Sequence, residues 1–241
     1  MKLIITLFFV LLFLSTDGFS QSIQERQQKV NECFKSGDFK CAEKELKGII
    51  RRQKKSPNLG RLYSDLGTIQ RRLGKNRDAI KSYNKAIELS PERVVFLTNR
   101  ATLFMQMGDF EKGSEDFEKA INLDPDNYAI GSDYALFKKN NGYIEEALND
   151  YNQLIEKFPE ISRLYNNRAD TKLRLNDLEG ATNDIEKALD LDPNNPIATV
   201  TKGEILLKQG NETDACTFFQ KAIELGLNPA RIQSLIDGCN D

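Results

Sequence analysis

The sequence predicts an all-α protein, an α-solenoid of stacked antiparallel helix pairs. Two kinds of residue recur every 34 residues, a period that fits one helix–turn–helix unit. A glycine or asparagine marks each expected turn, and a proline marks each expected helix end. The composition, 39% hydrophobic and 29% charged with little glycine and proline, suits a soluble, helix-rich chain. The turn markers are Gly74, Gly108, Gly142, Asn176 and Gly210, and the end markers are Pro91, Pro125, Pro159 and Pro193.

The second helix of each unit carries a small, a bulky and another small residue with the same period, as in Ala79, Tyr83 and Ala86. Helices that cross closely need small side chains where their backbones approach and a bulky one beside them. Glycine tolerates the positive φ of a helix C-cap, and proline cannot continue a helix. The equivalent residues are Gly113, Phe117 and Ala120; Ala147, Tyr151 and Leu154; Ala181, Ile185 and Ala188; and Ala215, Phe219 and Ala222.

The stretch from Gly60 to Arg93 holds the full set of these residues, with Tyr63, Leu66 and Gly67 on its first helix. It resembles one tetratricopeptide repeat. The resemblance implies a right-handed superhelix of about six repeats, followed by a C-terminal capping helix over Ala230 to Asp237 that shields the last apolar surface. The expected repeats are 23–59, 60–93, 94–127, 128–161, 162–195 and 196–229, and 230–241 forms the capping helix and tail.

Residues 1–20 have the three parts of a secretory signal peptide: Lys2, an apolar run from Leu3 to Leu14, and small residues at Gly18 and Ser20. The alternative is an uncleaved membrane anchor, but the apolar run is short for a span of about 20 residues. We therefore expect an exported protein, periplasmic or extracellular, whose mature chain begins near Gln21.

Four cysteines remain in the expected mature chain: Cys33, Cys41, Cys216 and Cys239. Because the units stack in order, the first two lie at one end and the last two at the other. We expect two local disulfides, Cys33–Cys41 and Cys216–Cys239, each fastening a terminal unit that lacks one neighbour. Four free thiols are the alternative; a redox motif is not expected, since no C-x-x-C is present.

The chain contains no histidine, which excludes a Ser-His-Asp triad, a Cys-His dyad and a histidine zinc site. We expect no enzyme activity, no cofactor and no small-molecule substrate. The loops 123–127 and 190–195 resemble calcium ligands, but the second has Asn195 and Thr201 where an EF-hand needs glycine and glutamate. No metal site is expected there, and nucleic acid is not an expected partner of an exported chain with an acidic remainder.

Charge is unevenly distributed along the sequence. Residues 23–93 hold 18 Lys and Arg against 9 Asp and Glu, a balance of +9, and residues 94–241 hold 15 against 26, a balance of −11. Opposite charges at the two ends would permit head-to-tail contacts between copies. The alternative function is therefore a structural subunit of a self-associating or cell-envelope complex.

The family resemblance implies that the first helices of the pairs line a groove that binds a peptide or helix of another protein. A clamp for a C-terminal carboxylate is not expected, because Asp65 stands where it needs asparagine. We therefore expect a non-catalytic interaction scaffold. Arginine side chains recognise carboxylates and phosphates, so one hypothesis is that an anionic, acidic partner segment docks at the first three repeats. The alternative is that these arginines are solvated or paired with neighbouring acids. The expected partner-binding residues are Arg61, Arg71, Arg72, Asn99, Asp133, Arg163, Asn166, Asn167 and Asp170.

Overall fold

The structure is a computed structural model that describes residues 23–239, so the expected signal peptide lies outside the described residues. The all-α prediction is confirmed, since no strand occurs between residues 23 and 239. None of the helices in this range is both long and apolar enough to span a membrane. After the helical residues 23–35 come α2 (Phe39–Arg52), α3 (Leu59–Arg72), α4 (Asn76–Leu89), α5 (Val94–Gln106), α6 (Phe110–Leu123), α7 (Tyr128–Asn140), α8 (Ile144–Lys157), α9 (Ser162–Arg174), α10 (Leu178–Leu191), α11 (Pro196–Lys208), α12 (Glu212–Glu224), a 3₁₀ turn (Pro229–Arg231) and α13 (Gln233–Asp237).

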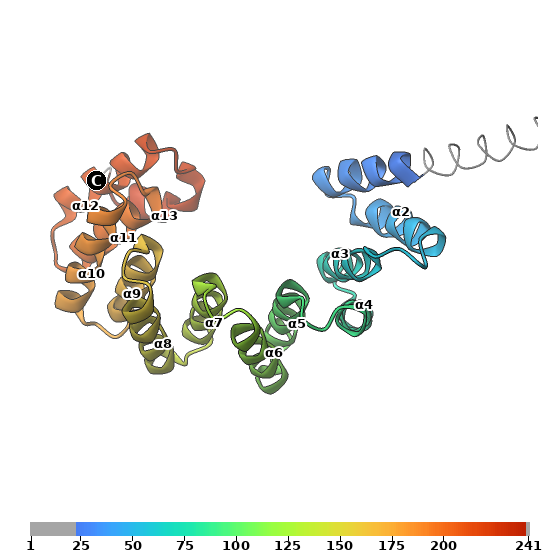
Figure 1. Cartoon of the computed structure of the whole chain (residues 1–241). Coiled ribbons are helices and arrows are strands. Elements are labelled where there is room, and N and C mark those ends of the chain that lie inside the picture. The colour runs from blue at the N-terminus through green and yellow to red at the C-terminus, as the bar shows by residue number, and fades with distance from the viewer. Residues whose placement is uncertain (1–22, 240–241) are drawn as a thin grey trace, which may run out of the picture. The chain divides into compact units, whose positions relative to one another are not determined.

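The helices form consecutive antiparallel pairs (Figure 1), grouped into two compact units that meet between Asp124 and Pro125. Unit 1 contains the pairs from residues 23–35 to α6, and unit 2 contains the pairs from α7 to α12 with the C-terminal turn and α13. Within unit 1, α3 also contacts α5, and within unit 2, α9 contacts both α7 and α11. In each unit, the first helices of successive pairs therefore lie side by side and form one face, here called the first-helix face.

The turns between paired helices have the left-handed backbone that the 34-residue glycine spacing predicts. Gly74 has a φ of 71° and Gly142 a φ of 90°, a region that L side chains rarely adopt. Asn176 stands in for glycine with a φ of 61°, which asparagine tolerates better than most residues. These turns let each second helix fold back on its first.

The core repeats the predicted pattern of small and bulky residues. Tyr83 and Tyr151 are fully buried, and a Cβ added to Gly67 would lie 2.6 Å from the Tyr83 ring. The absence of that Cβ lets α3 pack closely against α4. In unit 2, Leu154 replaces the second small residue, and Gly131 on α7 leaves the space: a Cβ there would lie 2.9 Å from Leu154 Cδ2.

The C-terminal cap differs from the single helix expected over residues 230–237. A 3₁₀ turn comes first, and α13 begins only at Gln233, because Ile232 has a non-helical backbone with φ −126° and ψ 22°. The apolar face is nevertheless used as expected. Ile232 is buried in the cluster around Phe219, and Leu235 and Ile236 pack against the same cluster.

One disulfide lies at each end of the described chain. Cys33–Cys41 joins the helical residues 23–35 to α2 with a Cα–Cα distance of 5.8 Å, and Cys216–Cys239 joins α12 to the residues after α13 at 5.6 Å. No cysteine in residues 23–239 is free. These are the two pairs expected from the stacking order.

Candidate partner-binding surface

A pocket of about 370 Å³ opens on the first-helix face of unit 1. Its apolar part consists of Val30, Leu46 and Ile69, which are buried, and of Phe34, whose side chain is 41% exposed. These residues come from three helices, so the pocket exists only because the first two repeats pack together. The polar lining consists of Gln27, Asn31, Lys35, Arg61, Asp65 and Thr68.

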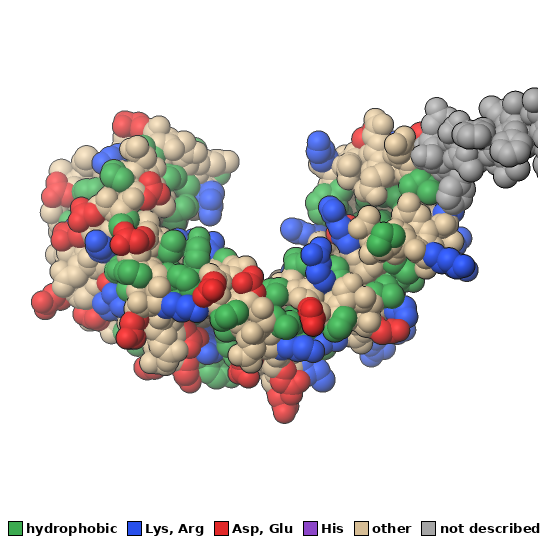
Figure 2. All heavy atoms as spheres, viewed as in Figure 1, with side chains coloured by type: hydrophobic (Ala, Val, Ile, Leu, Met, Phe, Trp, Pro, Cys, Tyr) green, Lys and Arg blue, Asp and Glu red, His purple; other side chains and the backbone are tan. Residues whose placement is uncertain are grey.

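Arg61 is an exposed cation at the pocket. Its side chain is 74% exposed, and its Nε lies 4.0 Å from Asp65 Oδ2, a long ion pair one helical turn away. Burial raises the pKa of Asp65, and the Arg61 guanidinium opposes that shift. Lysine and arginine side chains gather over α3 in Figure 2. Arg61 therefore keeps most of its hydrogen-bonding capacity for another molecule.

Arg71 and Arg72 lie in the last turn of α3, and neither lines the pocket. Arg71 Nη1 donates to Gln106 Oε1 at 3.3 Å, while its buried Nε has no hydrogen-bond partner. Arg72 is exposed. The three arginines expected to act together are thus divided between the pocket and the far end of the helix.

Two of the expected binding asparagines instead link successive repeats. Asn99 Nδ2 donates to Ser64 Oγ at 3.2 Å in unit 1, and Asn167 Nδ2 donates to Ser132 Oγ at 3.2 Å in unit 2. Both asparagines are half-buried. Asn166 is buried, and its Oδ1 has no hydrogen-bond partner. These amides contribute to the packing of neighbouring first helices.

Two of the three charged residues expected in the groove of unit 2 contact other side chains of that unit. Asp170 forms an ion pair with Lys139, which is only 3% exposed. Arg163 is exposed but lies over the ring of Tyr128, with its Cζ 5.4 Å from the centroid. Burial raises the pKa of Asp133, which the positive charge of Arg163 opposes. Asp170 and Arg163 are therefore already engaged in interactions within the unit.

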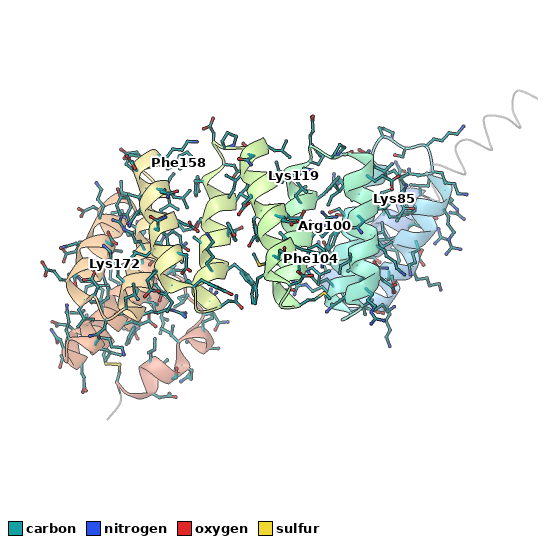
Figure 3. The ribbon with its side chains drawn as sticks, turned by 90° about the horizontal axis from the view of Figure 1, so that it is seen from below. Lys85, Arg100, Phe104, Lys119, Phe158 and Lys172 are labelled. Carbon is teal, nitrogen blue, oxygen red and sulfur yellow. A yellow bond between two sulfur atoms is a disulfide. The ribbon has the colours of Figure 1, made fainter. Side chains whose placement is uncertain are left out.

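Two arginines that the sequence reasoning missed hold repeats together. Arg100 on α5 forms two hydrogen bonds of 2.7 Å to the Asp116 carboxylate on α6 and one of 2.6 Å to Asn84 on α4. It also lies over the Phe104 ring at 5.7 Å (Figure 3). Arg168 repeats this arrangement 68 residues later. It contacts Asp184 at 2.6 and 2.8 Å and Asn152 at 2.9 Å.

The sequence carries a signal for this pair: Asn-Arg-Ala occurs at 99–101 and again at 167–169. The motif does not recur with the 34-residue period, because the intervening repeat has Asp133 and Tyr134 at the equivalent positions. It recurs only with a period of two repeats.

The loops that resemble calcium ligands supply helix caps and turn contacts. Asn195 Oδ1 accepts from the backbone N–H groups of Ile197 and Ala198, and its Nδ2 donates to Asp192 Oδ2 at 3.0 Å. Asp126 pairs with Lys157 at 3.1 Å. Among residues 23–239, no group of three or more acidic or cysteine side chains is placed to hold a metal ion.

Several known structures share this fold. PilF of Pseudomonas aeruginosa is 23% identical, covers 73% of this chain and 80% of its own, and has a TM-score of 0.58. PilW, described as a type IV pilus biogenesis factor, is 18% identical over 69% of this chain and 77% of its own, with a TM-score of 0.56. MamA is 19% identical over 73% and 96%, with a TM-score of 0.53. No curated protein matches the sequence.

Models of the tetratricopeptide repeat family match residues 59–93, 94–127, 135–196 and 166–230. Together these ranges cover more than half of the 241 residues. The ranges 59–93 and 94–127 coincide with the pairs α3–α4 and α5–α6, and the other two lie between α7 and the 3₁₀ turn. This chain belongs to the tetratricopeptide repeat family.

Proposed function

We propose that this protein is an exported, non-catalytic scaffold that binds an acidic segment of another protein on the first-helix face of unit 1. The observation that carries the proposal is the exposed Arg61 at the rim of an apolar pocket. An arginine with spare donors beside an apolar depression favours a carboxylate-bearing polypeptide. The excess of nine positive charges in residues 23–93 supports an acidic partner.

The expected export rests on the signal-type residues 1–20 and is supported by the two disulfides, which persist in oxidising compartments. The array would then consist of repeats at 23–59, 60–93, 94–127, 128–161, 162–195 and 196–229, as the sequence predicts. The repeat family and the lack of histidine support binding rather than catalysis.

Capture of partners from the envelope fraction tests this function. A variant with Arg61, Arg71 and Arg72 changed to glutamate should lose the captured protein. The matched control changes Lys40, Lys44 and Lys81 to glutamate, which alters the net charge equally at exposed positions on α2 and α4. Loss in the first variant alone supports the proposal, and equal capture by both variants overturns it.

A second candidate function, self-association, is favoured by the charge balances of +9 in residues 23–93 and −11 in residues 94–241. Light scattering at low and high salt tests it, because charge-driven contacts weaken with screening. Oligomers at about 10 mM salt that dissociate at about 500 mM would support head-to-tail assembly. A monomer at low salt would overturn it.

A further inference from the structure

We infer that the pocket of unit 1 holds a single apolar side chain of the acidic partner segment, an inference that rests on the proposed function. The partner is thus a short peptide motif in which an aliphatic or aromatic residue is flanked by aspartate or glutamate. Three features of the pocket favour this partner: its apolar floor, its charged rim and its exposed amides.

The floor is apolar and formed by side chains fixed in the core. Val30, Leu46 and Ile69 are at least 94% buried in the close-packed core, so the floor of the pocket is rigid. Phe34 forms one wall and packs edge-on against Phe39, with 5.4 Å between ring centroids. A volume of about 370 Å³ lies at the lower end for ligand sites and leaves room for one large side chain.

The rim selects the sign of charge. Arg61 and Lys35 are exposed at the pocket, against the single carboxylate of Asp65. Because Arg61 contacts Asp65 only at 4.0 Å, a peptide carboxylate can take the arginine's N–H groups without breaking a close ion pair. A basic peptide would meet two cations at the same rim and would be repelled.

The remaining lining suits an extended backbone. Gln27 and Asn31 are both exposed and lie four residues apart, one above the other on the same face of the helical residues 23–35. Each amide can donate and accept a hydrogen bond, as a peptide unit requires. The paired amides beside Arg61 therefore suit the backbone of an acidic peptide.

Defined peptides test the inference. The probes are labelled decapeptides with a central Leu, Ile, Met or Phe among Asp and Glu residues, measured by fluorescence anisotropy with the purified protein. The comparison peptides carry a central Ser in the acidic background, or a central Leu in a background of Lys and Arg. We expect at least one acidic apolar peptide to bind about tenfold or more tightly than its Ser counterpart, and the basic peptides not to bind.

Variants of the protein locate the peptide. Asn31→Phe places a ring at the pocket mouth and should weaken binding about tenfold or more, whereas Gln28→Phe, exposed on the same helix outside the pocket, should change it less than about twofold. Arg61→Gln should weaken binding and reduce its salt dependence, and Arg163→Gln in unit 2 is its control. Thermal melting monitored by circular dichroism verifies that each variant is folded.

Any of three results would overturn the inference. The Leu and Ser peptides bind with equal affinity, no acidic apolar peptide binds, or Asn31→Phe leaves the peptide affinity unchanged. Capture of the native partner distinguishes failure of the pocket inference from failure of the proposed function. If charge reversal at Arg61, Arg71 and Arg72 abolishes capture but Asn31→Phe does not, the scaffold function stands and the pocket inference falls. If Asn31→Phe blocks only the acidic peptide and capture survives both variants, the pocket inference stands and the proposed function falls.

Discussion

The first-helix faces of the two units have similar architecture but treat their charges differently. In unit 1, Arg61 remains 74% exposed beside an apolar pocket. In unit 2, Lys139 is buried against Asp170, and Arg163 lies over an aromatic ring. Both units thus consist of the same kind of helix pair. The side chains that make no close contact within a unit decide which first-helix face can bind another molecule.

The arginine clamps inside the two units show no such difference. The clamp of Arg100 with Asp116 in unit 1 and that of Arg168 with Asp184 in unit 2 have nearly the same geometry. Each holds three helices from two successive repeats. The contrast between alike clamps and unlike faces indicates that stability and binding are specified by different sets of residues.

The largest expected effect tests whether the interiors are equivalent. Tyr83→Ala and Tyr151→Ala each remove a fully buried ring and should each lower the free energy of unfolding by about 3–5 kcal/mol, through lost burial and the cavity left behind. Urea denaturation monitored by circular dichroism measures both. A loss below about 1 kcal/mol in one variant would show that its unit is packed more loosely and would break the equivalence.

The next largest effect is the loss of stability when the disulfide at either end of the described chain is removed. Replacing Cys33 and Cys41, or Cys216 and Cys239, by serine should cost about 2–4 kcal/mol, and somewhat more for the second pair because its loop spans 23 residues rather than 8. Hydrogen exchange should show the loss at the affected end. The first pair also fixes the helix that carries Phe34 and Asn31, so its removal alone should weaken peptide binding. If removal of either pair left peptide binding equally strong, the Cys33–Cys41 disulfide would not be needed to hold the Phe34 wall of the pocket in place.

A smaller effect is a difference between the two units in how their stability depends on pH. Burial tends to raise the pKa of Glu43, but hydrogen bonds and charge from Lys47, Lys75 and Gln70 outweigh burial and lower it to about 2. Because the folded-state pKa lies below the unfolded value, the carboxylate stabilises the fold above about pH 4.5. That stability, on the order of 2–3 kcal/mol, is lost as the pH falls through about 2.

Glu43→Gln should therefore lower stability at pH 7 and flatten its decline between about pH 4.5 and 2. The equivalent positions in unit 2 hold Leu148, Thr182 and Cys216, so acid should loosen unit 1 first. Amide exchange at several pH values measures this order. Simultaneous loss of protection in both units, unchanged by the substitution, would contradict the role of Glu43.

The spacing of Gly74 and Pro91 was enough to predict the helix pairs, because turns and helix ends depend on local backbone preference. The pairing of the cysteines also followed from the order of stacking. The contacts of the charged side chains could not be predicted in this way. Whether Arg71 faces solvent or Gln106 depends on how α3 lies against α5, and this is a property of packing between repeats.

The same limit applies to the pocket and to the cap. The pocket requires Phe34, Leu46 and Ile69 to converge from three helices, which no single repeat encodes. The late start of α13 depends on the backbone of Ile232, which is drawn into the core beside Phe219. Sequence periodicity identifies the repeating contacts, whereas contacts made once are visible only in the structure.

Site-specific photo-cross-linking to the captured partner tests most directly the central claim that unit 1 binds and unit 2 does not. A benzophenone amino acid is placed at Gln24 in one protein, one helical turn before Gln27 and outside the pocket lining, and at Arg163 in another; both residues are exposed. We predict a cross-linked partner from position 24, suppressed by excess acidic apolar peptide, and none from position 163. A cross-link from position 163 alone would contradict the account.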